Sequence, residues 1–282
     1  SKEDARKMGI QIVPISVRFG DEEFLDGVEI THEEFYTRLA ECDELPKTSQ
    51  PSPDTFMKVF NEAVAAGDDV LGIFISSDLS GTYQSACLAA LDVEEETRKK
   101  LYMVDSRSAS IGTALLIREV VKLRDAGVNV SDIAAACTEM SKYIKLTAVV
   151  GSLKYLKMGG RLSGAAAFAG TMLHITPVVS IEDGKVVVIG KTRGKKAAEK
   201  LMHDKLIKDG LSLTRDFMFG HINCSESLET FINKSLTYIS DVNGNVGVSS
   251  IGCSVGTHVG PGTYGIAYVE AAESGICLLY TS

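Results

Sequence analysis

Two short segments of this chain gather small hydroxyl side chains directly before an expected amphipathic helix. They are Thr48–Pro53, with the sequence TSQPSP, and Ser77–Thr82, with the sequence SDLSGT. The start of a helix offers unpaired backbone N–H groups and a partial positive charge, so it attracts an anion. Neither segment contains Lys or Arg. The two segments therefore predict a site that holds a carboxylate with neutral donors, which favours binding over bond breaking.

The elements around these segments predict how they are positioned. Strands are expected at 10–19, 70–75 and 101–104, and helices at 31–41, 52–67, from 83, at 108–125 and at 131–143. Alternating strands and helices are typical of a doubly wound parallel α/β/α sheet. Ligands bind beyond the carboxyl ends of such strands, so both hydroxyl segments are expected there, at equivalent places of one sheet.

The second half of the chain has a different pattern. A turn at Asp183–Gly184 predicts a hairpin, and the other elements alternate between strand and helix. The expected strands are 175–181, 185–190, 217–221, 245–251 and 265–269, and the expected helices are 195–208 and 227–239. We therefore expect two α/β domains that pack closely, because no long flexible linker separates them. Residues 1–150 form the parallel domain, and residues 151–282 form a mixed sheet with helices on one face.

The composition excludes several classes of protein. The net charge of −8 over 282 residues argues against a nucleic-acid partner, because no basic stripe is available to neutralise phosphates. The uncharged stretch 162–181 is interrupted by Gly and Pro, so we expect a short buried helix and a strand rather than a transmembrane segment. Six cysteines without a Cys-x-x-Cys pair and no secretory signal indicate buried thiols in a cytoplasmic protein.

Two segments look like phosphate-binding loops but do not fit. In Gly184–Thr192 the glycines are one residue too far apart, and the residues between them favour a strand. Gly260–Gly265 matches the dinucleotide fingerprint in its letters, but a strand follows it instead of a helix. We expect neither to bind a nucleotide, and we expect no cofactor.

The chain also contains residue types that catalytic and metal sites use. Ser80, Asp105 and His258 are the residue types of a serine hydrolase triad, although no Gly-x-Ser-x-Gly sequence surrounds Ser80. The five histidines are dispersed without a pair at ligand spacing, so no metal site is expected.

Several segments, in order along the chain, together resemble the DegV family of fatty-acid-binding proteins. They are TSQPS at 48–52, LSGTYQSA at 79–86, VDS at 104–106 with Ser110 and Gly112, SLKYL at 152–156, GGR at 159–161, and THVGPG at 257–262. The resemblance implies a two-domain α/β protein that holds one long-chain fatty acid between its domains. It also implies that the protein presents this acid to a separate ATP-dependent fatty acid kinase, which makes an acyl phosphate.

The resemblance also implies roles for individual residues. Thr48 and Ser80 match the family's carboxylate-binding residues, and Arg193 and His258 match positions tied to engagement of the kinase. Arg161 lies in a family signature, and a purely structural role for it stays open. We further expect the loops to be supported by Ser49, Gly81 and Thr82.

The uncharged stretch supplies candidates for lining the tail of the acid, with ordinary core packing as the alternative: Phe168, Met172, Leu173 and Ile175. Burying a sixteen-carbon tail stabilises the complex by roughly 10 kcal/mol, at about 0.8 kcal/mol per methylene. Desolvating the carboxylate costs several kcal/mol, which hydrogen bonds of about 1.5–3 kcal/mol each can offset. A site without Lys or Arg would also keep the carboxylate nucleophilic toward ATP.

The expected function is therefore that of a fatty-acid-binding, substrate-presenting subunit of a kinase, with no catalysis of its own. Two alternatives stay open. One is a serine-dependent lipid or acyl-ester hydrolase that uses Ser80, and the other is a carrier of a different hydrophobic acid.

The chain departs from the family pattern at both ends. Family members begin with a strand that leads to an Asp-Ser-Thr-like turn, whereas this chain starts at Ser1, so we expect a central strand to be missing. Residues Gly275–Ser282 do not continue the family pattern and are expected to be non-native.

Overall fold

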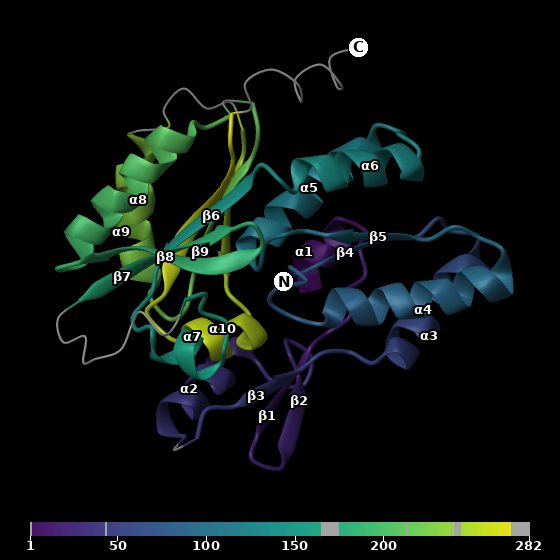
Figure 1. Cartoon of the computed structure of the whole chain (residues 1–282), viewed down its shortest axis with the longest axis horizontal. Coiled ribbons are helices and arrows are strands. Elements are labelled where there is room, and N and C mark those ends of the chain that lie inside the picture. The colour runs from purple at the N-terminus through teal and green to yellow at the C-terminus, as the bar shows by residue number, and fades with distance from the viewer. Residues whose placement is uncertain are drawn as a thin grey trace.

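The computed structural model describes residues 2–42, 44–164, 175–212, 214–237, 239 and 244–271. The helices are α1 (Lys2–Lys7), α2 (His32–Glu41), α3 (Pro53–Ala66), α4 (Thr82–Thr97), α5 (Ile111–Asp125), α6 (Val130–Met140), α7 (Lys154–Met158), α8 (Lys195–Asp209), α9 (Ser225–Leu236) and α10 (Cys253–Val259). The strands are β1 (Ser16–Phe19), β2 (Glu22–Leu25), β3 (Lys47–Ser49), β4 (Leu71–Phe74), β5 (Tyr102–Asp105), β6 (Ile144–Val149), β7 (Thr176–Glu182), β8 (Lys185–Thr192), β9 (Phe217–His221), β10 (Val246–Ser250) and β11 (Tyr264–Val269). The architecture is thus the mixed α/β class that the sequence predicts (Figure 1).

A six-stranded mixed sheet forms the larger part of the fold, with the strand order β10-β9-β11-β6-β7-β8. Only β10 and β9 run parallel, and the other neighbours are antiparallel. Side chains alternate between the two faces as the pleat requires. Leu146 and Ala148 of β6 belong to the hydrophobic cluster on one face of the sheet, while Val149 belongs to the cluster on the opposite face. Helices α8 and α9 cover one face, and α5, from the first half of the chain, packs on the other (Figure 1).

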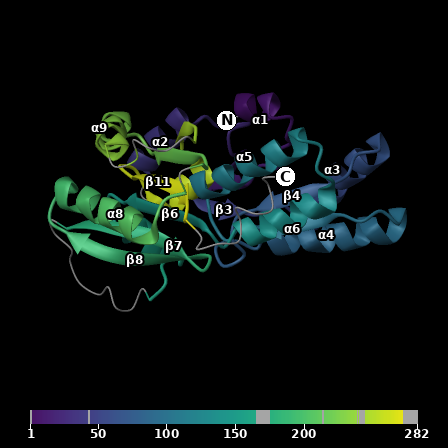
Figure 2. The same ribbon diagram turned by 90° about the horizontal axis from the view of Figure 1, so that it is seen from above.

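A separate two-stranded parallel sheet consists of β4 and β5, which are joined through α4. Together with α3, α4 and α6 it lies at one end of the long axis, with the six-stranded sheet toward the other end and α5 between them (Figure 2). With the expected domain limit at residue 150, β6 falls in the first domain. In the structure it is an inner strand of the six-stranded sheet, whose other strands follow that limit.

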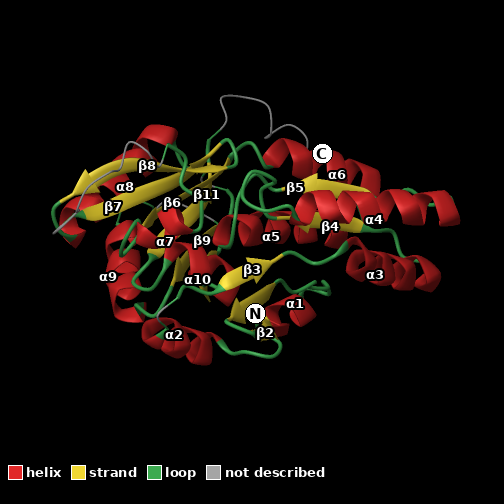
Figure 3. Cartoon of the chain, turned by 60° about the horizontal axis from the view of Figure 1, so that its bottom comes forward, coloured by secondary structure: helices red, strands yellow, loops and turns green. Residues whose placement is uncertain are grey.

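The strand expected at 10–19 is shorter in the structure and belongs to a different sheet from β4 and β5. Only Ser16–Phe19 is a strand, and it pairs antiparallel with β2 and β3 instead of joining β4. Pro14 has no N–H for a ladder, and Gly20, with a φ of 57°, turns the chain back into a hairpin. This three-stranded sheet lies near α2 and α10 (Figure 3).

The helix-capping predictions are confirmed. Thr31 and Glu34 form the reciprocal capping box of α2. Ser52 caps α3, Pro53 is its first residue, and Gly67 ends it in the left-handed conformation. The helix expected from residue 108 begins at Ile111 instead, because Ser110 has a φ of 49° that does not continue a helix.

The turn predictions in the second half are also confirmed. Asp183 and Gly184, both with positive φ, connect β7 and β8. The P-loop look-alike is strand β8, and Gly260–Gly262 forms the turn before β11. The short buried helix expected after Leu162 falls mostly on residues 165–174, which lie outside the described residues.

A buried ionic cluster ties α5 to the start of β9. Glu119 and Asp216 are 1% and 2% exposed. Lys122 contacts both carboxylates at 2.8 Å, Arg215 contacts Glu119 at 2.8 Å, and Arg118 contacts Asp216 at 3.2 Å. The cluster therefore fixes the helix against the sheet. In the described parts of the chain, no helix has the length and apolar character needed to cross a membrane.

Candidate ligand-binding site

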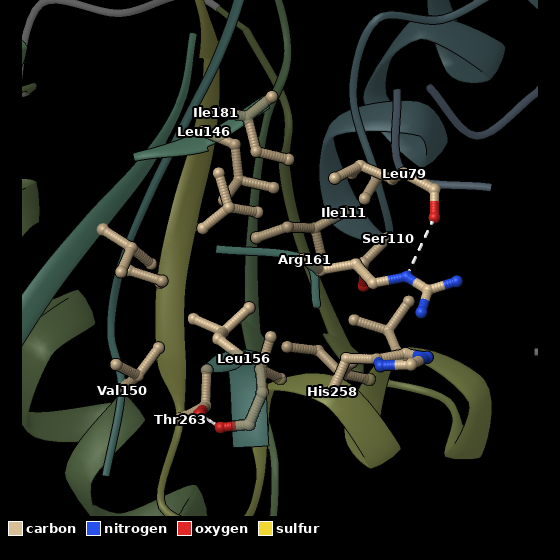
Figure 4. Close-up of a pocket in the computed structure, with 18 of the residues that line it drawn as sticks. Leu79, Ser110, Ile111, Leu146, Val150, Leu156, Arg161, Ile181, His258 and Thr263 are labelled. Atoms are coloured by element: carbon tan, nitrogen blue, oxygen red, sulfur yellow. Dashed lines mark hydrogen bonds between the residues drawn. The ribbon is translucent and has the colours of Figure 1, made fainter. Parts of the chain in front are cut away.

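An apolar cavity lies between the six-stranded sheet and the elements that face it from the first half of the chain. Its non-atom space amounts to about 760 Å³ when open solvent at the cavity is included, and its lining is almost entirely apolar. Strands β6 and β7 contribute Leu146, Ala148 and Ile181, and the start of α5 contributes Ile111 from the opposite side (Figure 4). The cavity can therefore take an apolar chain.

Polar groups gather at one side of this cavity. Figure 4 shows the Arg161 side chain above the ring of His258, with Ser110 nearby. Arg161 follows the Gly159–Gly160 turn after α7, and its Nε donates to the carbonyl of Leu79 at 3.2 Å. A guanidinium carries five N–H donors and suits a carboxylate. The expectation of a site without Arg or Lys is wrong for this cavity, because Arg161 lines it.

The imidazole of His258 connects the cavity with β3. Its Nε2 lies 2.9 Å from Thr48 Oγ1, while Nδ1 is buried and has no hydrogen-bond partner among the described residues. A Cβ on Gly159 would lie only 2.4 Å from Nδ1, so glycine is needed for this close approach. Burial, together with the nearby Arg161 charge, lowers the pKa of His258 to about 4. The ring is therefore neutral at pH 7.

This depressed pKa predicts a pH-dependent stability. Between about pH 6.5 and pH 4 the unfolded chain protonates His258 while the folded chain does not, so stability falls as the pH falls. We expect His258 to account for a loss of up to about 3 kcal/mol across this window. Urea unfolding at pH 7 and pH 4.5 measures it, with His258→Asn as the comparison. Equal pH dependence in the two proteins would contradict the assignment.

The two hydroxyl segments meet, although they do not follow strands of one sheet. Thr48 lies within β3 of the antiparallel sheet, whereas Ser80 follows β4 of the parallel pair. A Cβ on Gly81 would lie 2.3 Å from the Gln50 side chain, and Ser85 Oγ donates to the Pro51 carbonyl at 2.7 Å. The segments are therefore in direct contact.

Neither Thr48 nor Ser80 is among the residues that line the cavity. Thr48 lies behind His258, and Ser80 is the neighbour of the lining residue Leu79. Ser80 Oγ accepts from the backbone N–H of Thr82 at 3.3 Å and lies 2.8 Å from the Thr82 hydroxyl. Thr48 therefore reaches the polar side through His258, whereas the hydroxyl contacts of Ser80 are with the first residue of α4. Ser49 belongs to β3, where it pairs with β1.

The remaining candidates are not brought to this cavity. Arg193 is exposed just after β8, and no contact in the described residues joins it to His258. Ile175 is half-buried before β7 and is not among the lining residues. The other expected tail-lining residues, Phe168, Met172 and Leu173, lie outside the described residues.

The described residues do not assemble a serine hydrolase triad. The carboxylate of Asp105 accepts from the backbone N–H groups of Ser77 and Arg107, at 3.2 and 2.7 Å. The imidazole of His258 contacts Thr48 rather than Ser80. The hydrolase alternative therefore has no support in this geometry.

Comparisons with known proteins agree with this architecture. A family model described as an uncharacterised protein family, DegV, matches residues 1–271. The chain belongs to the DegV family. A DegV domain-containing protein from Clostridium acetobutylicum is 36% identical over 272 residues, which cover 93% of this chain and 91% of that protein.

Solved structures of DegV proteins share the fold. A fatty-acid-binding DegV protein from Thermus thermophilus superimposes with a TM-score of 0.86 at 30% identity, covering 95% of both chains. A DegV lipid-binding protein from Thermotoga maritima gives a TM-score of 0.83 at 28% identity, covering 97% of this chain and 95% of that one. This DegV chain therefore has the two-domain fold of proteins that bind fatty acids.

Proposed function

We propose that this protein binds a long-chain fatty acid, with the tail in the apolar cavity and the carboxylate beside Arg161 and His258. The observation that carries the proposal is an apolar cavity with a guanidinium and a neutral imidazole together on one side. The fatty-acid-binding relative at 30% identity and the lipid-binding relative at 28% identity support it.

The roles of the other residues follow from their contacts. Arg161 pairs with the carboxylate, since its Nε bond to Leu79 and its second bond to the Gly159 carbonyl hold the guanidinium in place. Thr48 orients His258 toward the same group. Ser80 holds the loop that carries Leu79, or turns its own hydroxyl to the carboxylate when the acid is bound.

We also propose that the bound acid is presented to a separate ATP-dependent fatty acid kinase. The support for this role is the family resemblance and the exposed Arg161 on the polar side of the cavity (Figure 4). We place the division between the two domains before β6, because this strand belongs to the larger sheet.

Titration with a fluorescent fatty acid tests the binding site. Arg161→Gln removes a charge-assisted hydrogen bond of about 1.5–3 kcal/mol, so we expect affinity to fall about 10- to 100-fold. Thr48→Val combined with Ser80→Ala is expected to weaken binding as well. Arg107→Gln is the matched control, because Arg107 pairs with Asp183 at 2.8 Å and does not line the cavity. Equal affinity of wild type and Arg161→Gln would refute the proposed head-group site.

Incubating the loaded protein with ATP and a cognate kinase separates presentation from storage. Acyl phosphate is expected to form, and its absence would favour a carrier. Arg193→Ala is expected to lower this rate while leaving the affinity for fatty acid unchanged.

A further inference from the structure

Three side chains that can ligate a metal meet beside α2 and α10, and none of them lines the cavity. Asp26 follows β2, His32 is the first residue of α2, and Cys253 is the first residue of α10. One ligand atom from each lies within 4.8 Å of the other two. More than two hundred residues separate Cys253 from the other two, so this group departs from the expectation of no metal site, which rested on spacing along the sequence.

We propose that Asp26, His32 and Cys253 bind one zinc ion, with water as the fourth ligand. A thiolate, an imidazole and a carboxylate are donors that suit Zn²⁺, whereas Mg²⁺ and Ca²⁺ require oxygen ligands. The thiol proton leaves to solvent when the sulfur binds, and the two negative ligands then balance the charge of the ion. Tetrahedral zinc places its ligand atoms about 3.5 Å apart, so the separations within the group, which are at most 4.8 Å, would contract when the ion binds.

Neighbouring groups already orient these ligands. Asp26 Oδ1 accepts from the backbone N–H of Cys253 at 3.1 Å, and Oδ2 accepts from that of Ser254 at 2.8 Å. Each carboxylate oxygen keeps a further lone pair for a metal. His32 Nδ1 lies 2.9 Å from Ser250 Oγ, which fixes the ring. Partners of this kind hold the ligands of metal sites in position.

Accessibility distinguishes a metal site from a catalytic one. Cysteine, histidine and aspartate also form nucleophilic triads, but the Cys253 residue is 0% exposed and cannot reach a substrate. Asp26 and His32 are only partly buried, so an ion enters from their side. A bound ion would join the end of β2 to the first turns of α2 and α10. Because His258 lies five residues after Cys253, the ion would also fix the helix that carries the imidazole of the cavity.

Cobalt titration of the reduced, chelator-treated full chain tests this site. We expect one equivalent of Co²⁺ to produce a thiolate-to-cobalt charge-transfer band in the near ultraviolet, which Zn²⁺ then abolishes. Cys253→Ser is expected to remove the band. Cys224→Ser is the matched control, because Cys224 is a half-buried thiol that donates to the Thr263 carbonyl and lies outside the group.

A second variant keeps the test decisive if Cys253→Ser fails to fold. His32→Ala changes a partly exposed residue and is expected to weaken Co²⁺ binding at least tenfold. No charge-transfer band in the wild type would overturn the proposal, as would a band that persists in folded Cys253→Ser. Unchanged affinity in His32→Ala would also overturn it. None of these readouts depends on fatty acid binding.

Discussion

Enlarging Ala148 to Val, Leu and Phe in turn is expected to shorten the longest fatty acid that the protein binds. Ala148 lies on β6, is 7% exposed and lines the cavity, so a larger side chain occupies space that the tail needs. Each methylene excluded from the cavity removes about 0.8 kcal/mol, or roughly fourfold in affinity. Ala148→Phe is expected to abolish binding of a long acid. A chain-length series titrated against each variant measures the effect.

The series contains its own test of folding. Ala148→Leu is expected to retain a shorter acid, which a misfolded protein would not do. Ala126→Phe is the control for added bulk, because Ala126 is the exposed cap residue directly after α5. If Ala148→Phe binds a long acid as tightly as the wild type, the tail does not occupy this cavity.

Local signals account for the parts of the fold that the sequence predicts well. Thr31 and Ser52 cap their own helices, and the Asp183–Gly184 turn selects its own hairpin, so nearby residues decide these structures. The neutral hydroxyl segments also meet as expected. The prediction that both segments lie at equivalent places of one sheet is wrong, because Thr48 lies in β3, whose pairing with β1 depends on contacts across about thirty residues.

Helix α10 shows what local sequence cannot supply. It contains Gly256 and the β-branched Val255 and Thr257, which are poor helix formers. Its first turn is held by the carboxylate of Asp26, and a Cβ on Gly256 would lie 2.1 Å from the Tyr36 hydroxyl. Contacts distant in sequence therefore stabilise this helix.

Arg161 lines the cavity, and the sequence did not predict this place for it. The Gly-Gly pair before it was a visible signal, since Gly160 has a φ of 70° in the turn that ends α7. The side chain reaches the cavity only because the Leu79 carbonyl, from the loop after β4, accepts its Nε–H. The sequence predicts a carboxylate that is held by neutral donors alone. A cation beside the proposed carboxylate changes this expectation. In the proposed complex this pair would orient the acid, and a kinase would compete with Arg161 for the carboxylate oxygens.

Asp216→Asn is expected to destabilise the protein by about 3 kcal/mol, because it leaves cations facing a neutral amide in a buried cluster. Burial alone would raise the pKa of Asp216, but hydrogen bonds from Lys122 and Asn245 lower it below its usual value. The folded state therefore holds this carboxylate ionised at 2% exposure. Urea unfolding at pH 7 measures the loss of free energy.

Asp204→Asn is the matched control, since Asp204 pairs with Lys200 at 2.7 Å on the exposed face of α8 and is expected to cost less than about 0.5 kcal/mol. A similar loss in both variants would show that the Glu119–Asp216 cluster contributes no more than a surface pair. A large loss in Asp216→Asn alone would show that the cluster stabilises the packing of α5, which carries the cavity residue Ile111, against β9. Fatty acid affinity should then fall in Asp216→Asn even though Asp216 does not line the cavity.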